Sequence, residues 1–162
     1  MIFPDDLIVG DTLGYASADL TNLAIEWKEG DDLAHVEVYA GNGQSWASRN
    51  GIGVNIYPFR LAGLKIVRRN KGIFEEEPVE VWFKSGVQGM KYGFGDILAE
   101  VEIGASGYSG TDLTKCDGVD CSHLYAALQE VARCPHFDPT YPKNHIEPRD
   151  MKLSLASVQV YP

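Results

Sequence analysis

Alternating apolar and polar residues mark a series of short strands in the first half of the chain. Residues 34–40 have His-Val-Glu-Val-Tyr at their centre, and Asn42-Gly43 follows, a strong signal for a tight β-hairpin. Residues 44–48 are the expected return strand. The same pattern predicts further strands at 12–16, 51–57, 64–69 and 153–160.

The hairpin sets which residues share a face of the expected sheet. With Asn42 and Gly43 at its turn, Ala40 would lie opposite Ser45, and Glu37 would lie opposite Ser48. Side chains along a strand alternate between the two faces. We therefore expect His35 to lie on the same face as Glu37.

Helical spacing is clearest in residues 121–133, where Leu124, Leu128 and Val131 fall on one side and Cys134-Pro135 ends the run. A second helical spacing covers 20–27, residues 79–84 and 96–103 fit either a helix or a strand, and 75–78 fits an acidic turn. Four prolines make 135–148 an expected irregular loop. One α+β domain covering residues 1–162 accounts for these elements and for the chain length.

The net charge, the hydropathy and the first residues of the chain limit its possible partners and location. The net charge of −9 would repel phosphate backbones, so we expect no nucleic-acid partner. No run of about 18 apolar residues occurs, which predicts no membrane span. The first residues, Met-Ile-Phe-Pro-Asp-Asp, lack the pattern of a signal peptide. These features predict a cytoplasmic or phage-associated protein.

Three cysteines, an odd and low number, argue against a disulfide framework and favour a free thiol with another purpose. Cys121 follows Asp120, a good N-cap residue, at the start of the expected helix. Free backbone N–H groups and the helix dipole favour a thiolate there, and the N–H of Cys121 is a candidate oxyanion donor. Cys121 is therefore a candidate nucleophile.

A nucleophilic cysteine needs a base. Of the four histidines, His123 points away from Cys121 on the same helix, and His136 and His145 lie in the proline-rich segment. His35 lies on a strand, and rigid elements hold catalytic groups best. A histidine at the edge of the core with a purely structural hydrogen bond is the alternative interpretation.

These residues resemble a known family. Asp120-Cys121-Ser122 before an apolar helix is similar to the D-C-S-G-L motif of the NlpC/P60 cysteine hydrolases, and the segment from His35 to Gly43 is similar to their H-x-G-I-Y-x-G-D-G hairpin. The histidine precedes the cysteine here, as in the circularly permuted branch that includes YiiX-like proteins and the lecithin retinol acyltransferase group. Further similar segments are 10–13, 51–54 and 92–98. The resemblance implies a papain-like fold, circularly permuted, with an antiparallel sheet packed against the helix that carries Cys121.

The sequence departs from the family at several site positions. His123 and Glu37 replace glycines, and Ala47 and Ser48 stand where the family has the polar residue that orients the histidine. Glu37, Ser45 or Ser48 could take that role, and a glutamate is the best acceptor for an imidazole N–H. The resemblance also suggests substrate-binding or oxyanion positions at Tyr15, Asp120 and Ser122.

The resemblance implies acyl transfer through the Cys121–His35 pair, without a cofactor, on an amide or ester bond. A peptidoglycan fragment, a related small peptide amide and a lipid acyl group are the substrates it suggests, and we expect an amide of the cell-wall type.

Two other interpretations compete with a hydrolase. One is a non-catalytic binding domain on the same fold, which the apolar Ala47 favours. The other is a structural zinc module, because zinc prefers cysteine and histidine ligands. Its candidate ligands crowd into 21 residues: Cys116, Cys121, His123, Cys134 and His136.

Overall fold

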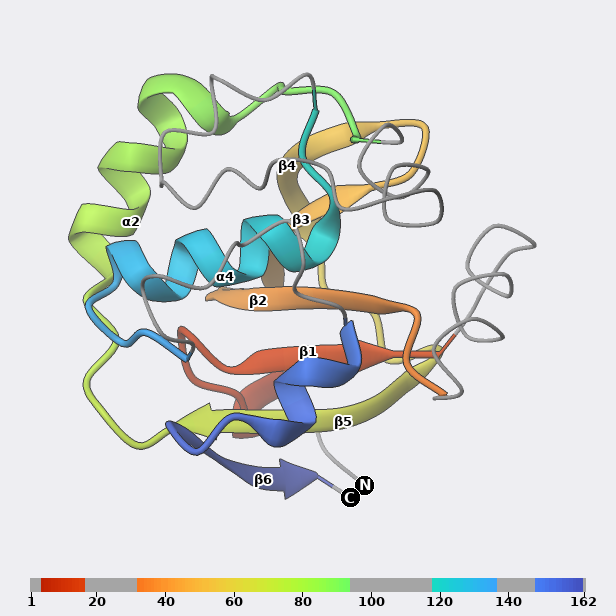
Figure 1. Cartoon of the computed structure of the whole chain (residues 1–162), viewed down its shortest axis with the longest axis vertical. Helices are drawn as coiled ribbons and strands as arrows, with labels where there is room; N and C mark the ends of the chain where they lie inside the picture. Colours follow the sequence, from red (N-terminus) through yellow and green to blue (C-terminus); the bar gives the residue numbers. More distant parts are fainter. Residues whose placement is uncertain (1–3, 17–31, 94–117, 137–147, 162) are drawn as a thin grey trace, which may run out of the picture.

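A computed structural model describes residues 4–16, 32–93, 118–136 and 148–161 of this chain (Figure 1). Its centre is a six-stranded antiparallel sheet with the order β4-β3-β2-β1-β5-β6. The strands are β1 (Thr12–Tyr15), β2 (His35–Gly41), β3 (Gln44–Arg49), β4 (Gly53–Pro58), β5 (Leu64–Asn70) and β6 (Ser157–Tyr161). The antiparallel sheet and its helices confirm the α+β class.

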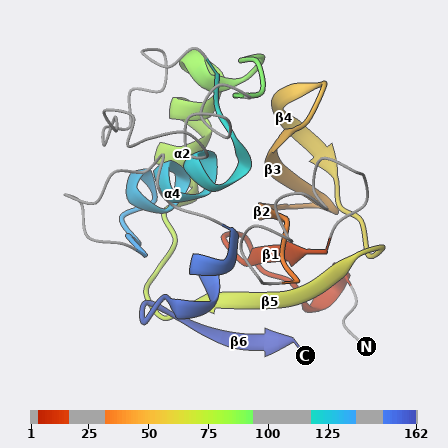
Figure 2. The same ribbon diagram turned by 45° about the vertical axis from the view of Figure 1, so that its right-hand side comes forward.

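Helices α2 (Glu76–Trp82) and α4 (Cys121–Val131) lie on one side of the sheet (Figures 1 and 2). A π-helical segment, Phe83–Val87, continues α2, and short 3-10 helices cover Pro4–Asp6 and Pro148–Leu153. In the described part of the chain, no helix has both the length and the apolar character that crossing a membrane requires.

The strands at 34–40, 44–48, 51–57 and 64–69 and the helix at 121–133 are confirmed to within a few residues. Residues 75–78 were expected to form an acidic turn, and this prediction is wrong, because α2 begins at Glu76. Pro78 is compatible with the first helical turn, where its missing N–H costs nothing, and the carboxylates of Glu76 and Glu77 suit the helix dipole. The predicted elements at 20–27 and 96–103 lie outside the described residues.

The main core lies between the sheet and the two helices. Val36, Val38 and Trp46 from the sheet pack with Leu124 and Leu128 of α4 in one buried cluster. A smaller cluster covers the opposite face of the sheet, and it includes Leu13, Tyr15, Tyr39, Leu64 and Val67. Both faces of β1 and β2 are therefore buried, which holds the side chains of these two strands in fixed positions.

The hairpin register differs from the prediction by one residue. Ser45 pairs with Tyr39 rather than Ala40, because an irregularity between Tyr39 and Gly41 admits one extra residue. Gly41, Asn42 and Gly43 all have positive φ, which allows the tight turn. The shift places Ser45 on the Glu37 face and moves Ser48 to the face that carries Trp46.

Candidate functional site

Cys121 is the first residue of α4, and its side chain is buried. Asp120 is the N-cap, as predicted: its Oδ1 accepts hydrogen bonds from the His123 backbone N–H at 2.8 Å and the Ser122 hydroxyl at 3.0 Å. Burial raises the pKa of Asp120, and these hydrogen bonds oppose the rise. The hydroxyl of Ser122 thus serves the cap, and Cys121 lies in the first turn, where a thiolate is favoured.

The loop before α4 is fixed by three contacts. Ser48 donates its hydroxyl to the carbonyl of Val119, and the Val119 N–H donates to the carbonyl of Lys91 at 3.0 Å. Gly118 packs so tightly on Gly93 that a Cβ on Gly118 would lie 2.6 Å from the Cα of Gly93. Ser48, expected as a residue that orients the histidine, instead ties β3 to this loop.

His35 and Glu37 share one face of β2, as predicted, and their side chains meet. Nε2 of His35 lies 3.0 Å from Oε1 of Glu37. Arg49 donates from Nε to Oε1 at 2.9 Å and from Nη2 to Oε2 at 3.2 Å, and Ser45 donates its hydroxyl to Oε2. Burial raises the pKa of Glu37, but the hydrogen bond and charge of His35, with the hydrogen bonds from Arg49 and Ser45, outweigh it and hold the pKa at about 2. Glu37 is therefore a buried carboxylate in its charged form.

The Glu37 contact defines the tautomer of His35. A carboxylate only accepts hydrogen bonds, so Nε2 must carry a proton. In the neutral ring the other nitrogen, Nδ1, is then an acceptor, which is what a general base requires.

Cys121 and His35 begin their respective elements, and α4 and β2 start at the same end of the molecule, on the right of Figure 1. Among the groups that oppose the rise in the pKa of Asp120, the charge of a protonated His35 is the weakest. Val36 and Val38 face α4, so His35 and Glu37 project from the other side of β2. The side chain of His35 therefore lies on the face of β2 opposite to α4, at the end of the strand nearest the start of that helix.

Tyr15 lies beside His35, with ring centroids 6.0 Å apart. Burial raises the pKa of its phenol, and its hydroxyl donates to the carbonyl of Arg60 at 3.2 Å. The ring also supports the Arg60 guanidinium, whose central carbon lies 4.7 Å from the ring centroid. Tyr15 thus lies next to His35, and its hydroxyl is used by a backbone carbonyl.

Two residues of the zinc hypothesis, Cys134 and His136, have other partners in the described part of the chain. The thiol of Cys134 donates to the carbonyl of Ile73 at 2.9 Å. Nδ1 of His136 meets the Tyr125 hydroxyl, and Nε2 meets Oδ1 of Asn70. Cys116 lies outside the described residues, within which no three His, Cys, Asp or Glu side chains gather as metal ligands.

The burial of His136 predicts that the free energy of unfolding depends on pH. Burial, with the charge of Arg68, lowers its pKa from 6.5 to about 4. The unfolded chain therefore takes up a proton at higher pH than the folded chain, so stability present above pH 6.5 is lost as the pH falls toward 4. We expect urea unfolding to show a loss of about 2 kcal/mol between pH 7.5 and 5. His136→Asn should remove most of this loss, and His145→Asn should retain it; equal pH dependence in both variants would contradict the assignment.

Sequence reasoning overlooked Arg49 and Arg60, the two arginines around Glu37. A correct hairpin register would have indicated Arg49, because continuing the observed pairing places it opposite His35. Arg60 lies in the connection between β4 and β5, and no local pattern in the sequence predicts that its side chain reaches Glu37.

The comparison with solved structures finds the crystal structure of the metalloprotein yiiX from Escherichia coli O157:H7, also described as DUF1105. The TM-score is 0.63 at 16% sequence identity, over 95% of this chain and 98% of that chain. No protein-family model matches the sequence, and no curated protein matches it. The chain therefore has a YiiX-like fold.

Proposed function

We propose that this chain is a thiol hydrolase that cleaves an amide or ester bond, with Cys121 as nucleophile, His35 as general base and Glu37 as the residue that positions His35. The observation that carries the proposal is the buried Glu37 carboxylate 3.0 Å from Nε2 of His35, at the end of the sheet where α4 begins with Cys121. The YiiX-like fold supports a papain-like hydrolase.

The proposed reaction uses the groups of this chain in sequence. Nδ1 of His35 takes the proton of Cys121, and the thiolate attacks the carbonyl carbon of the substrate. The backbone N–H of Cys121, at the start of α4, stabilises the oxyanion. The imidazolium, held by Glu37, then protonates the leaving amine or alcohol, and water hydrolyses the thioester. We also propose that the substrate is an amide of the cell-wall peptide type. The chain would form one domain with the circularly permuted topology.

Two features weigh against the competing functions. Ala47 suggested a binding domain because it supplies no polar group, but Glu37 provides the missing carboxylate from the strand of His35 itself. The name of the yiiX structure describes a metalloprotein. In this chain the described residues do not fit such a site, because both ring nitrogens of His136 and the thiol of Cys134 have protein partners.

The rate of alkylation tests the Cys121–His35 pair without knowledge of the substrate. Iodoacetamide should react with Cys121 at pH 6 about tenfold faster in the unmodified protein than in His35→Ala, because the imidazole raises the thiolate fraction. The rates should converge near pH 10, where the thiol ionises unaided. Peptide mass spectrometry would quantify Cys121 separately from Cys116 and Cys134.

His145→Ala is the matched histidine variant, and its Cys121 should react at the unmodified rate. A slow reaction in His145→Ala with an unchanged rate in His35→Ala would reject His35 as the base. Equal slow labelling of all three cysteines in the unmodified protein would reject the hydrolase.

A further inference from the structure

Arg60 places a second guanidinium beside the His35–Glu37 pair. Its Nη2 lies 3.8 Å from Oε1 of Glu37, the same oxygen that contacts Nε2 of His35. The guanidinium lies over the ring of Tyr15, which is itself next to His35. Arg60 is therefore a neighbour of the proposed general base.

Glu37 has no hydrogen-bonding capacity left for Arg60. Its Oε1 accepts from His35 and Arg49, and its Oε2 accepts from Ser45 and Arg49. A carboxylate offers about four such acceptor sites, so these contacts fill it. The 3.8 Å separation from Arg60 is longer than a hydrogen bond.

The positive charge of Arg60 is thus in excess of the negative charge that Glu37 supplies. Arg49 already balances the single charge of Glu37 through two hydrogen bonds. Nε of Arg60 is buried without a hydrogen-bond partner in the described part of the chain, while the side chain as a whole is 35% exposed. A buried donor without a protein partner is uncommon, and a bound ligand or water is one explanation for it.

The geometry suits one kind of ligand. The contact with the Tyr15 ring restricts the guanidinium, and a fixed guanidinium presents a planar fork that matches a carboxylate. The chain as a whole carries a net charge of −9, so a cation at this point is a local feature rather than part of a basic surface.

We infer that Arg60 is a specificity-determining residue that binds a carboxylate of the substrate beside His35. The inference rests on the proposed function and deepens it, because it selects anionic acyl substrates over their neutral counterparts. Arg60 acts on substrate binding, and the chemistry stays with Cys121 and His35.

Two alkylating reagents of nearly equal size test this charge preference. In each case the Cys121 thiolate attacks the CH₂ carbon, the C–S bond forms, and iodide leaves. Iodoacetate carries a carboxylate and iodoacetamide carries a neutral amide in its place. The ratio of their rate constants at Cys121 therefore measures the preference for a carboxylate, and effects on thiol reactivity that the two reagents share cancel from the ratio.

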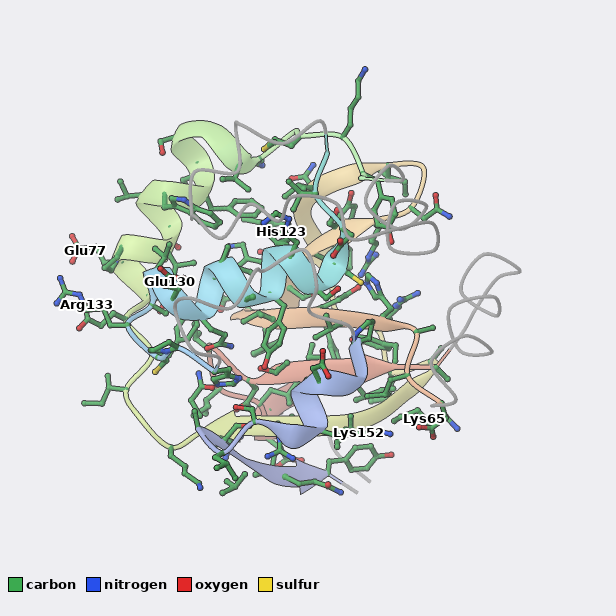
Figure 3. All side chains as sticks on the ribbon, in the orientation of Figure 1. Lys65, Glu77, His123, Glu130, Arg133 and Lys152 are labelled. Carbon is green, nitrogen blue, oxygen red and sulfur yellow. The ribbon has the colours of Figure 1, made fainter. Side chains whose placement is uncertain are left out.

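The variants are R60Q, R60K and the matched charge control R133Q. Arg133 lies just beyond the far end of α4 from Cys121 (Figure 3), is mostly exposed, and pairs with Glu75 at 3.4 Å. We expect R60Q to lower the iodoacetate-to-iodoacetamide ratio by about fivefold to tenfold, the effect of one charge-assisted contact at a partly exposed site. R60K should give an intermediate ratio, because lysine keeps the charge but loses the fork.

An unchanged ratio in R60Q would overturn the inference, and so would an equal fall in R133Q, which would indicate only long-range charge. Should R60Q fail to fold, R60K provides the test, and a ratio equal to that of the unmodified protein would then reject the fork. The proposed function fails separately, if Cys121 labelling by iodoacetamide is independent of His35.

Discussion

Cys121→Ala is expected to lower kcat/KM for hydrolysis of 4-nitrophenyl acetate by at least about 10³-fold, because the variant lacks the sulfur that forms the acyl intermediate. The activated ester is used because it reports acylation without requiring the natural leaving group. The side chain of Cys121 is small and lies in the first helical turn, so the fold should survive its loss. Circular dichroism and thermal unfolding would verify this.

Cys134→Ala is the matched cysteine control. Cys134 lies just after the end of α4 and is also buried. Its thiol donates to the carbonyl of Ile73. Burial raises the pKa of this thiol, which keeps it in the unreactive protonated form. Cys134→Ala should hydrolyse the ester at the unmodified rate. Full activity in Cys121→Ala, or its loss in Cys134→Ala, would assign the nucleophile elsewhere.

Glu37→Gln is expected to destabilise the protein by about 3 kcal/mol and to lower kcat. The amide has one acceptor oxygen and no charge, whereas the carboxylate accepts hydrogen bonds from His35, Arg49 and Ser45. The substitution leaves the charged Arg49 without its partner and directs an NH₂ group at other donors. Urea unfolding would measure the first effect and ester hydrolysis the second.

Asp11→Asn separates the structural role of Glu37 from its effect on the base. Asp11 is a second buried carboxylate, and Arg69 donates to its two oxygens at 2.9 Å and 2.7 Å. Asp11→Asn should cost similar stability and leave the pH profile of ester hydrolysis unchanged. Glu37→Gln should lower kcat far more than Asp11→Asn, because the imidazole loses the acceptor that fixes its orientation.

A double variant makes the distinction sharper. Glu37→Leu combined with Arg49→Leu removes both charges, and this should recover most of the stability that Glu37→Leu alone loses. It should not recover hydrolysis if Glu37 positions His35. Recovery of both together would show that Glu37 has only a structural role.

Local chemistry in the sequence determined much of the fold. The Asn42-Gly43 turn and the alternating residues of β2 and β3 predicted the hairpin, since the period of side chains in a strand is a local property. The N-cap by Asp120 at the start of α4 was readable for the same reason. Alternation alone also placed His35 and Glu37 on one face of β2.

Only the tertiary structure decided the partners of these groups. The extra residue between Tyr39 and Gly41 moved Ser48 away from Glu37 and brought it to the loop before α4, and the period-two pattern cannot register such an irregularity. Arg60 reaches Glu37 from the β4–β5 connection through the packing of non-neighbouring strands. The sequence thus determined that Asp120 caps the helix of Cys121 and that His35 and Glu37 share a face, because residue type and spacing are local. Long-range packing determined that Glu37 is enclosed by two arginines, because contacts between distant segments leave no periodic trace in the chain.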